Sequence, residues 1–356
     1  MESLEILFEK PPIVENINDR KVRINHPNTL LVGPSGSGKS TILIDFLSTK
    51  EPHSFLYINL NDLRVHKEGL FEKLEIFYKK HNLSLLAIDN LFEKPNFNTK
   101  LNLIATSQDS TLSVDGLEKV KVDMLDFEEF IAFSKDLPIK TLFNLYAKYG
   151  RSPKTLSLPQ SKIISFLQEN LQLALKDELL IKIFTKFSSY QSTPTSYFQI
   201  YKELKNSCKI SKDRLYKSVD FLESISFLHF VPKFDSPKSA KKIYLNNFAL
   251  KSALVFKKDF LKRFENIIFC ELIALNEDIF YTNRLDFYLP SQKRAIVAIP
   301  FLPPELIIRR FKSLLPHLKE LGVEILTVLT VGNEGSGAKD GIRCEIIPFW
   351  EWALRQ

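Results

Sequence analysis

The chain has 356 residues, which is too long for one compact core, so two or three domains are expected. Its hydrophobic content of 44% and charged content of 26% exclude a disordered or fibrous chain. The formal net charge of +7 is a modest excess of basic residues and does not by itself identify a nucleic-acid-binding protein.

The first predicted elements flank a glycine-rich loop. Thr29–Val32 is an apolar run typical of a buried parallel strand, and residues 41–47 place apolar side chains on one helical face. Between them, residues 33–40 match the pattern GxxxxGK followed by Ser or Thr, whose lysine and final hydroxyl serve phosphates and Mg²⁺. The predicted nucleotide-binding residues are Gly33, Pro34, Ser35, Gly36, Ser37, Gly38, Lys39, Ser40 and Thr41.

A second metal ligand is expected at the end of a neighbouring strand. The apolar run from Leu83 ends in Asp89, which we interpret as this ligand, the alternative being a helix N-cap. The next residue is Asn90, and an amide cannot accept a proton from the attacking water. With Lys39, Asp89 and Asn90 in the catalytic positions, the sequence predicts nucleotide binding with slow hydrolysis.

Further elements alternate between strand and helix. Ser54–Asn59 and Leu101–Thr106 are predicted strands, and Phe71–Lys80 is a predicted helix. Thr106 and Ser107, at the end of their strand, are predicted to sense the terminal phosphate or else to form a simple turn. The alternation indicates an α/β fold with a parallel sheet and helices on both faces.

The middle of the chain is predicted to be helical from Leu156 to Phe187 and then to form a helix-turn-helix with wing strands. Its helices are Phe198–Leu204 and a second one capped by Ser211, and the wing strands are Leu228–Val231 and Ile243–Leu245. The residues predicted to contact nucleic-acid phosphates are Lys212, Arg214, Lys217, Lys241 and Lys242. The alternative interpretation is a basic face used only for protein contacts.

The last part, from Phe264 onward, is predicted to be α/β again. Thr327–Val331 is a predicted strand, and the glycine-rich stretch 332–337 lacks the Gly-Lys-Ser ending, so we expect a flexible loop. The aromatic residues 349–352 are predicted to dock the chain end on the core, or to mark a partner surface.

The order of these segments resembles bacterial and archaeal AAA-type P-loop ATPases that carry a C-terminal domain of unknown function. The resemblance rests on the phosphate loop, the strands ending in Asp89 and Ser107, the stretch Val122–Phe130, and the later segments Lys241–Asn247 and Phe264–Leu272. It implies ATP with Mg²⁺ as the ligand, a winged helix after the ATPase domain, and a C-terminal fold similar to PD-(D/E)xK nucleases.

Two departures from this family bear on catalysis. Leu117 follows Gly116 where the family has an arginine, so a cation that could stabilise phosphate charge is missing there. In the C-terminal part Glu271 and Asp286 are kept, but Ala298 and Pro300 replace the carboxylate and lysine of a nuclease, and these two cannot complete a metal site.

We therefore expect an AAA-type ATPase domain over 1–150, a helical and winged-helix domain over 151–250, and a degenerate nuclease-like α/β domain over 251–356. The predicted function is a nucleotide-dependent switch, with slow ATP hydrolysis, coupled to duplex DNA. The alternatives are an ATP-gated protein-interaction module and, less favoured, a nucleotide-dependent nuclease. Widely spaced cysteines, no apolar run that spans a bilayer and no signal peptide predict a cytoplasmic protein without a membrane partner. The sequence leaves open the protein partner and whether the chain forms an oligomer.

Overall fold

The computed structural model describes residues 2–13, 18–134, 137–236 and 238–355, which form two compact units. Unit 1 contains the described residues up to Met124 together with Ser152–Lys154 and Ser224–Ser226. Unit 2 contains Leu125–Arg151, Thr155–Glu223 and the chain from Phe227 onward. Residues 125–149, expected in the first domain, thus belong to unit 2, while the division into three domains stays a prediction.

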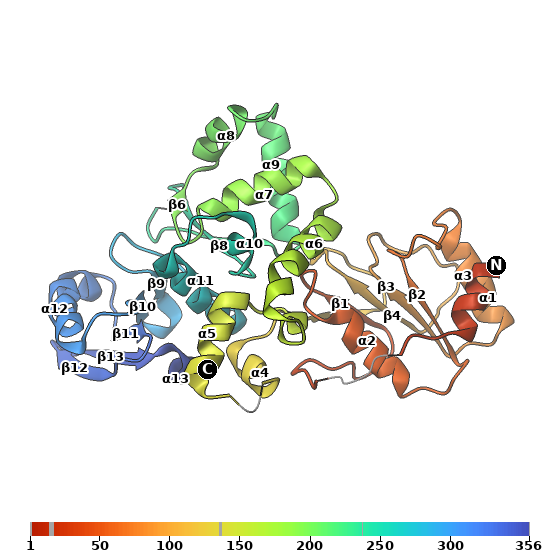
Figure 1. The fold of residues 1–356 in the computed structure, drawn as a ribbon, viewed down its shortest axis with the longest axis horizontal. Helices are drawn as coiled ribbons and strands as arrows, with labels where there is room; N and C mark the ends of the chain where they lie inside the picture. The colour runs from red at the N-terminus through yellow and green to blue at the C-terminus, as the bar shows by residue number, and fades with distance from the viewer. Residues whose placement is uncertain (1, 14–17, 135–136, 237, 356) are drawn as a thin grey trace. The chain divides into compact units, whose positions relative to one another are not determined.

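Unit 1 is built on a parallel five-stranded sheet in the order β2-β3-β4-β1-β5 (Figure 1). The strands are β1 (Thr29–Val32), β2 (Phe55–Asn59), β3 (Leu85–Asp89), β4 (Leu103–Ser107) and β5 (Glu118–Lys121). The helices are α1 (Glu2–Glu9), α2 (Lys39–Ser48) and α3 (Leu70–Lys80). This is the α/β arrangement predicted for the P-loop part of the chain, and it brings the ends of β1, β3 and β4 to one edge of the sheet.

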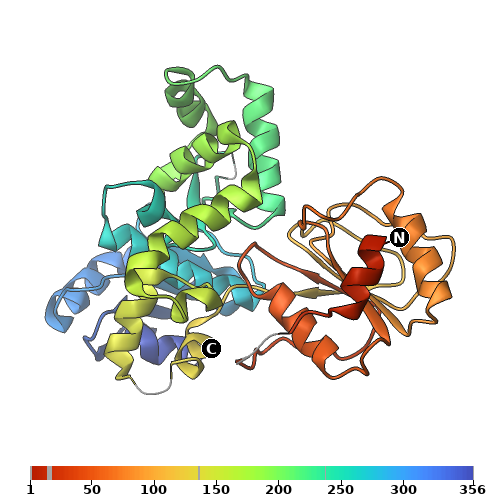
Figure 2. The same cartoon turned by 45° about the vertical axis from the view of Figure 1, so that its right-hand side comes forward.

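The two faces of this sheet are covered by different helices. On one face, Leu30, Leu56 and Leu86 pack with apolar residues of α1 and α3, and Figure 2 shows α1 lying close to α3. On the other, Leu31 and Ile104 pack against Leu43 of α2. Successive residues of each strand therefore point to opposite cores, which explains why the strands read as continuous apolar runs.

Unit 2 begins with helices that end at identifiable caps. They are α4 (Phe127–Ala132), α5 (Ile139–Tyr149), α6 (Ile163–Leu175), α7 (Glu178–Ser189), α8 (Tyr197–Lys205), α9 (Lys212–Ser224), α10 (Leu250–Leu254) and α11 (Phe260–Leu272). The continuous helical pattern predicted from Leu156 is interrupted, because Lys176 adopts a φ of 55° and the Asp177 carboxylate caps the N–H groups that start α7.

Unit 2 also contains two sheets. The smaller is antiparallel, in the order β6-β8-β7, and the larger has the order β12-β13-β11-β10-β9 with a parallel centre. The strands are β6 (Pro194–Thr195), β7 (Leu228–Val231), β8 (Lys241–Leu245), β9 (Phe287–Leu289), β10 (Arg294–Ala298), β11 (Ile325–Thr330), β12 (Gly335–Lys339) and β13 (Ile342–Pro348). Two further helices are α12 (Pro304–Glu320), which packs on the larger sheet, and α13 (Phe349–Ala353).

Expectations from the sequence concerned two local segments of unit 2, the glycine-rich stretch 332–337 and the aromatic residues 349–352. The glycine-rich stretch expected to be a loop instead enters β12, because residues 335–339 pair antiparallel with β13. The aromatic end docks on the core as expected, since the Phe349 and Trp352 side chains are buried. None of the helices in the described ranges has the length and apolar character needed to cross a membrane.

Candidate functional site

The glycine-rich loop of unit 1 connects β1 to the start of α2 and depends on three glycines. A Cβ at Gly33 would lie 2.0 Å from the Val122 carbonyl oxygen, so only glycine fits beside this strand end. Gly36 and Gly38 have φ values of 81° and 93°, in the left-handed region. Glycine at these positions therefore allows the loop to turn tightly just before α2.

Lys39 begins α2 and is almost fully buried. Its Nζ donates hydrogen bonds of 2.8 Å to the carbonyl oxygens of both Gly33 and Pro34, so the ammonium lies over the loop. Burial lowers the pKa of Lys39 to about 8, although the nearby charge of Asp89 raises it. The amine remains largely protonated at neutral pH, which is the form that attracts phosphate.

Asp89, at the end of β3, accepts hydrogen bonds from hydroxyl groups of three elements. Oδ1 accepts from Ser40 at 3.0 Å and from Thr106, and Oδ2 accepts from Tyr57 at 3.0 Å. Asp89 is buried, as is Thr106. The structure thus gathers the two predicted metal ligands, Ser40 and Asp89, at one point beside the predicted sensor Thr106.

Asn90 lies at the adjacent position with a left-handed φ of 62°. Its side-chain amide donates to Asn59 Oδ1 at 3.0 Å, and its backbone N–H donates to Thr106 Oγ1 at 2.9 Å. The amide therefore bridges β2 and β3. It adds no proton acceptor equivalent to a carboxylate to this part of the site.

Ser107, the other predicted sensor, is also buried. Its hydroxyl donates to the Leu91 carbonyl at 2.7 Å and accepts from the Asp109 N–H at 3.2 Å. Both contacts stabilise the chain after the strand. Of the two residues, only Thr106 contacts Asp89, and the sensor role stays a prediction.

Sequence patterns did not reveal two residues at this site. Tyr57 contacts Asp89, and burial raises its pKa above the ordinary tyrosine value. Arg20 lies before any predicted element, yet it donates to the Ser37 carbonyl and, at 2.8 Å, to the Asp123 carbonyl. A polar residue in the apolar strand 55–59 was a usable signal for Tyr57; nothing in the sequence linked Arg20 to the loop.

The loop fits a phosphate group on two observations besides its sequence. The Ser37 hydroxyl is buried without a hydrogen-bond partner among the described residues, so it has a donor to offer. The hydrogen bonds of the buried Lys39 ammonium in the described part of the chain go to neutral carbonyls, and Asp89 acts on it only as a nearby charge. An oxyanion would supply a charged hydrogen-bond acceptor for this cation.

The basic residues predicted for nucleic acid lie in different environments. Lys212, Arg214 and Lys217 are exposed on α9, although Arg214 pairs with Asp177 at 2.5 Å. The ammonium of Lys212 lies over the Phe198 ring, 5.5 Å from its centre. Lys241 is half-buried.

For Lys242, the sequence-based prediction of a contact with nucleic-acid phosphates is wrong. Its side chain is buried, and Nζ contacts Glu265 Oε1 at 2.7 Å and Asp286 Oδ1 at 3.2 Å. Adjacent residues of a strand point to opposite faces, so only one of Lys241 and Lys242 could face solvent. Lys242 is therefore unavailable to nucleic-acid phosphates.

The two acidic residues kept in the C-terminal part do not form one site. Glu271 accepts from the Tyr146 hydroxyl at 2.8 Å, whereas Asp286 contacts Lys242 and accepts from the Ala298 N–H at 2.9 Å. Asp286 thus connects β8 to the end of β10. Among the described residues, no group of three or more His, Cys, Asp or Glu side chains could hold a metal ion.

Comparison with known proteins agrees with the loop geometry. Residues 25–116 match a family described as an AAA domain, and this supports an AAA-type P-loop ATPase that binds nucleotide. No curated protein matches the chain.

The chain is also similar to several solved structures, at low identity. The Walker-type ATPase PABY2304 of Pyrococcus abyssi has 13% identity and a TM-score of 0.45, covering 65% of this chain and 91% of its own. AMPPCP-bound DnaA from Aquifex aeolicus has 12% identity and a TM-score of 0.26, covering 90% and 92%. The Aeropyrum pernix ORC1 protein in complex with DNA has 10% identity and a TM-score of 0.30, covering 65% and 87%.

Proposed function

We propose that the chain binds Mg²⁺-ATP and acts as a nucleotide-dependent switch coupled to duplex DNA. The observation that carries the nucleotide part is the meeting of Lys39, Ser40 and Asp89 around the glycine loop. Ser40 and Asp89 would hold Mg²⁺, which supplies positive charge for the phosphate oxygens. The loop N–H groups and Lys39 would bind the phosphates themselves.

Hydrolysis is proposed to be slow. The position after Asp89 carries an amide that is already engaged with Asn59, so no carboxylate there can polarise the attacking water. Leu117 packs against the apolar core of unit 1 in the place of the family's arginine. Arg20, the cation near the loop, donates to the carbonyls of Ser37 and Asp123.

For the second part of the proposal, α8, α9, β7 and β8 would form a winged helix within residues 151–250. Support comes from the helix pair capped by Ser196 and Ser211, followed by an antiparallel strand pair. Lys212, Arg214, Lys217 and Lys241 would contact DNA phosphates. Residues 251–356 would then be a nuclease-like domain without nuclease chemistry, and the chain would function in the cytoplasm.

An ATP-gated protein-interaction module is the second candidate. It is favoured by the local partners of the basic residues, since Arg214 pairs with Asp177 and Lys212 lies over Phe198. Cations already engaged in this way contribute less to a phosphate contact. A nuclease is disfavoured, because Asp286 contacts Lys242 and Ala298 brings no side-chain ligand.

Replacement of the loop lysine tests the nucleotide part. Lys39→Ala removes the charge that faces the phosphates, so the dissociation constant for Mg²⁺-ATP should rise by more than about tenfold, or about 1.4 kcal/mol. Titration calorimetry on the full chain measures this constant. Lys50→Ala removes an exposed lysine just beyond α2 and serves as the matched control. Unchanged affinity in a folded Lys39→Ala protein would contradict the proposal.

A further inference from the structure

Unit 2 contains an open cavity of about 670 Å³ that is separate from the phosphate loop. Its size lies within the range of small-molecule sites. Residues of β8, of the segment before β9 and of α12 line it. Its charged and hydroxyl side chains are those of Lys242, Tyr281, Thr282, Arg284, Asp286, Arg310 and Ser313.

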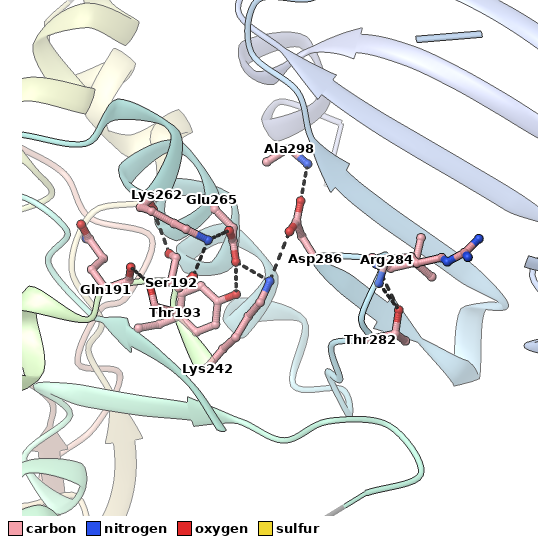
Figure 3. A network of polar contacts seen from close by, with 12 residues as sticks. Gln191, Ser192, Thr193, Lys242, Lys262, Glu265, Thr282, Arg284, Asp286 and Ala298 are labelled. Atoms are coloured by element: carbon pink, nitrogen blue, oxygen red, sulfur yellow. Dashed lines mark hydrogen bonds and ion pairs between the residues drawn. The ribbon is translucent and has the colours of Figure 1, made fainter. Parts of the chain in front are cut away.

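Beside the cavity, four charged residues balance one another. Lys242 lies between Glu265 and Asp286, and Lys262 reaches the other oxygen of Glu265 at 3.4 Å (Figure 3). Two ammonium groups thus face two carboxylates, and the cluster has no net charge. It holds Lys242 and Asp286 in place without leaving a charge for a ligand to neutralise.

The two arginines of the cavity have no such partner. Arg284 and Arg310 are exposed, and neither guanidinium forms an ion pair or hydrogen bond within the described ranges. Each is therefore a cation that faces the cavity without a compensating carboxylate. Two guanidinium groups without an ion-pair partner at one cavity favour a ligand that brings negative charge.

The backbone that carries these arginines is held in a defined arrangement. Thr282 Oγ1 accepts from the N–H groups of Arg284 and Leu285, at 3.2 and 3.0 Å. The same oxygen lies 3.0 Å from Nε2 of His317, which is on α12 with Arg310. This contact joins the two segments, so the separation of the arginines is set before any ligand arrives.

We propose that this cavity binds a small phosphorylated molecule with hydroxyl groups, of the size of a nucleoside diphosphate. Arg284 and Arg310 bind its phosphate oxygens, because guanidinium groups form paired charge-assisted hydrogen bonds with phosphate. The Ser313 hydroxyl, which donates to the Arg310 carbonyl at 2.7 Å, stabilises the turn of α12 that carries Arg310. Asp286, whose charge Lys242 balances, accepts a hydrogen bond from a ligand hydroxyl.

A calorimetric titration tests the site in the full chain. The Lys39→Ala background weakens the phosphate loop, and inorganic pyrophosphate and ADP are the probes. We expect one site, with Arg284→Gln and Arg310→Gln each weakening pyrophosphate binding by about tenfold and the double variant abolishing it. ADP should bind more tightly than pyrophosphate, because its ribose hydroxyls reach Asp286.

Arg309→Gln is the matched control, since Arg309 is exposed beside Arg310 on α12 but does not line the cavity. Thermal unfolding of each variant checks the fold. Absence of pyrophosphate binding, or an equal loss in Arg309→Gln, overturns the proposal. Displacement of pyrophosphate by duplex DNA, with the same dependence on Arg284 and Arg310, would assign the site to nucleic acid instead. If the phosphate-loop test fails, a second binding event can remain in the Lys39→Ala background, but dependence on Arg284 and Arg310 and independence of Arg309 still identify binding at this cavity.

Discussion

At the scale of single residues, the phosphate-loop site depends on shared hydrogen bonds around one carboxylate. Asp89 accepts from Ser40, Tyr57 and Thr106, and these hydroxyls fix the orientation of its two oxygens. A carboxylate oriented in this way is prepared for a cation, because its position requires no rearrangement. The neighbouring Asn90 lacks the carboxylate that could accept a proton from the attacking water.

Replacing Asn90 with a proton acceptor should raise ATP turnover. A positioned general base contributes about 10²–10⁴-fold to a rate, so Asn90→Glu should increase steady-state ATP hydrolysis by a factor in that range. The φ of 62° at this position costs a glutamate about 1–2 kcal/mol of stability. Asn90→Gln is the control, because glutamine has the size and the backbone cost of glutamate at this position but no carboxylate to accept a proton.

Two results would contradict this prediction. One is a wild-type rate already near the enzyme median of about 10 per second. The other is equal turnover of the Glu and Gln variants, which would show that the water site is incomplete for other reasons.

At the scale of elements, α11 is joined to α4 and α5 through Glu271. Its carboxylate accepts from the Tyr146 hydroxyl on α5 and, at 3.4 Å, from the Phe127 N–H at the start of α4. Burial raises the pKa of Glu271 to about 7, despite the opposing charge of Arg151. Helices far apart in the sequence thus meet at a carboxyl that titrates near neutral pH.

This titration predicts a pH-dependent effect of Glu271→Gln on stability. Between its unfolded pKa near 4.5 and its folded pKa of about 7, the folded chain binds more protons. The contribution of Glu271 to the free energy of unfolding is therefore present below pH 4.5 and falls as the pH rises to about 7. One pKa unit corresponds to about 1.4 kcal/mol. As the pH rises through this range, the free energy of unfolding of Glu271→Gln should therefore increase by about 3 kcal/mol relative to that of the wild type.

Urea unfolding of both proteins at pH 5 and pH 8 measures the difference. Glu345→Gln, which changes a half-buried glutamate on β13, is the control. A Glu271→Gln difference that is constant with pH would mean that the carboxyl remains ionised in the folded chain throughout this range.

Elements with strong local signals were predictable from the sequence, and contacts that depend on register were not. The loop, the strand ending in Asp89 and the Ser211 cap are local patterns of a few residues, which is why they were found. Tyr57 reaches Asp89 only because β2 and β3 pair in parallel with Asn59 opposite Asp89. Lys242 was misassigned because its partners, Glu265 and Asp286, lie far along the chain.

At the scale of the whole molecule, the proposed switch requires energetic coupling between nucleotide and DNA. If ATP changes the DNA affinity by some factor, DNA must change the ATP affinity by the same factor. DNA binding itself should weaken steeply with salt, with a log–log slope of about 0.9 per phosphate contact. Reversing Arg214 and Lys217 to Glu should abolish binding, because both side chains are exposed on α9.

Fluorescence anisotropy with a labelled duplex, at several salt concentrations and with and without Mg²⁺-ATP, measures these quantities. The control is the double variant Lys50→Glu and Lys182→Glu, which changes the net charge by the same amount as the α9 variant but at exposed positions outside α9. This control should bind DNA far better than the α9 variant. If the wild type has no salt-sensitive affinity for the duplex, the protein-interaction module becomes the leading function.

The close approach of Gly33 to Val122 also determines how natural selection would act on the loop. A side chain at Gly33 would collide with the backbone beyond β5, whatever ligand the protein uses. A descendant that had abandoned nucleotides would therefore still retain this glycine in order to fold. Lys39 differs, because a buried amine costs folding free energy and an apolar replacement would relieve that cost. Among divergent descendants, loss of the lysine would mark loss of activity, while the glycine would persist in both active and inactive lineages.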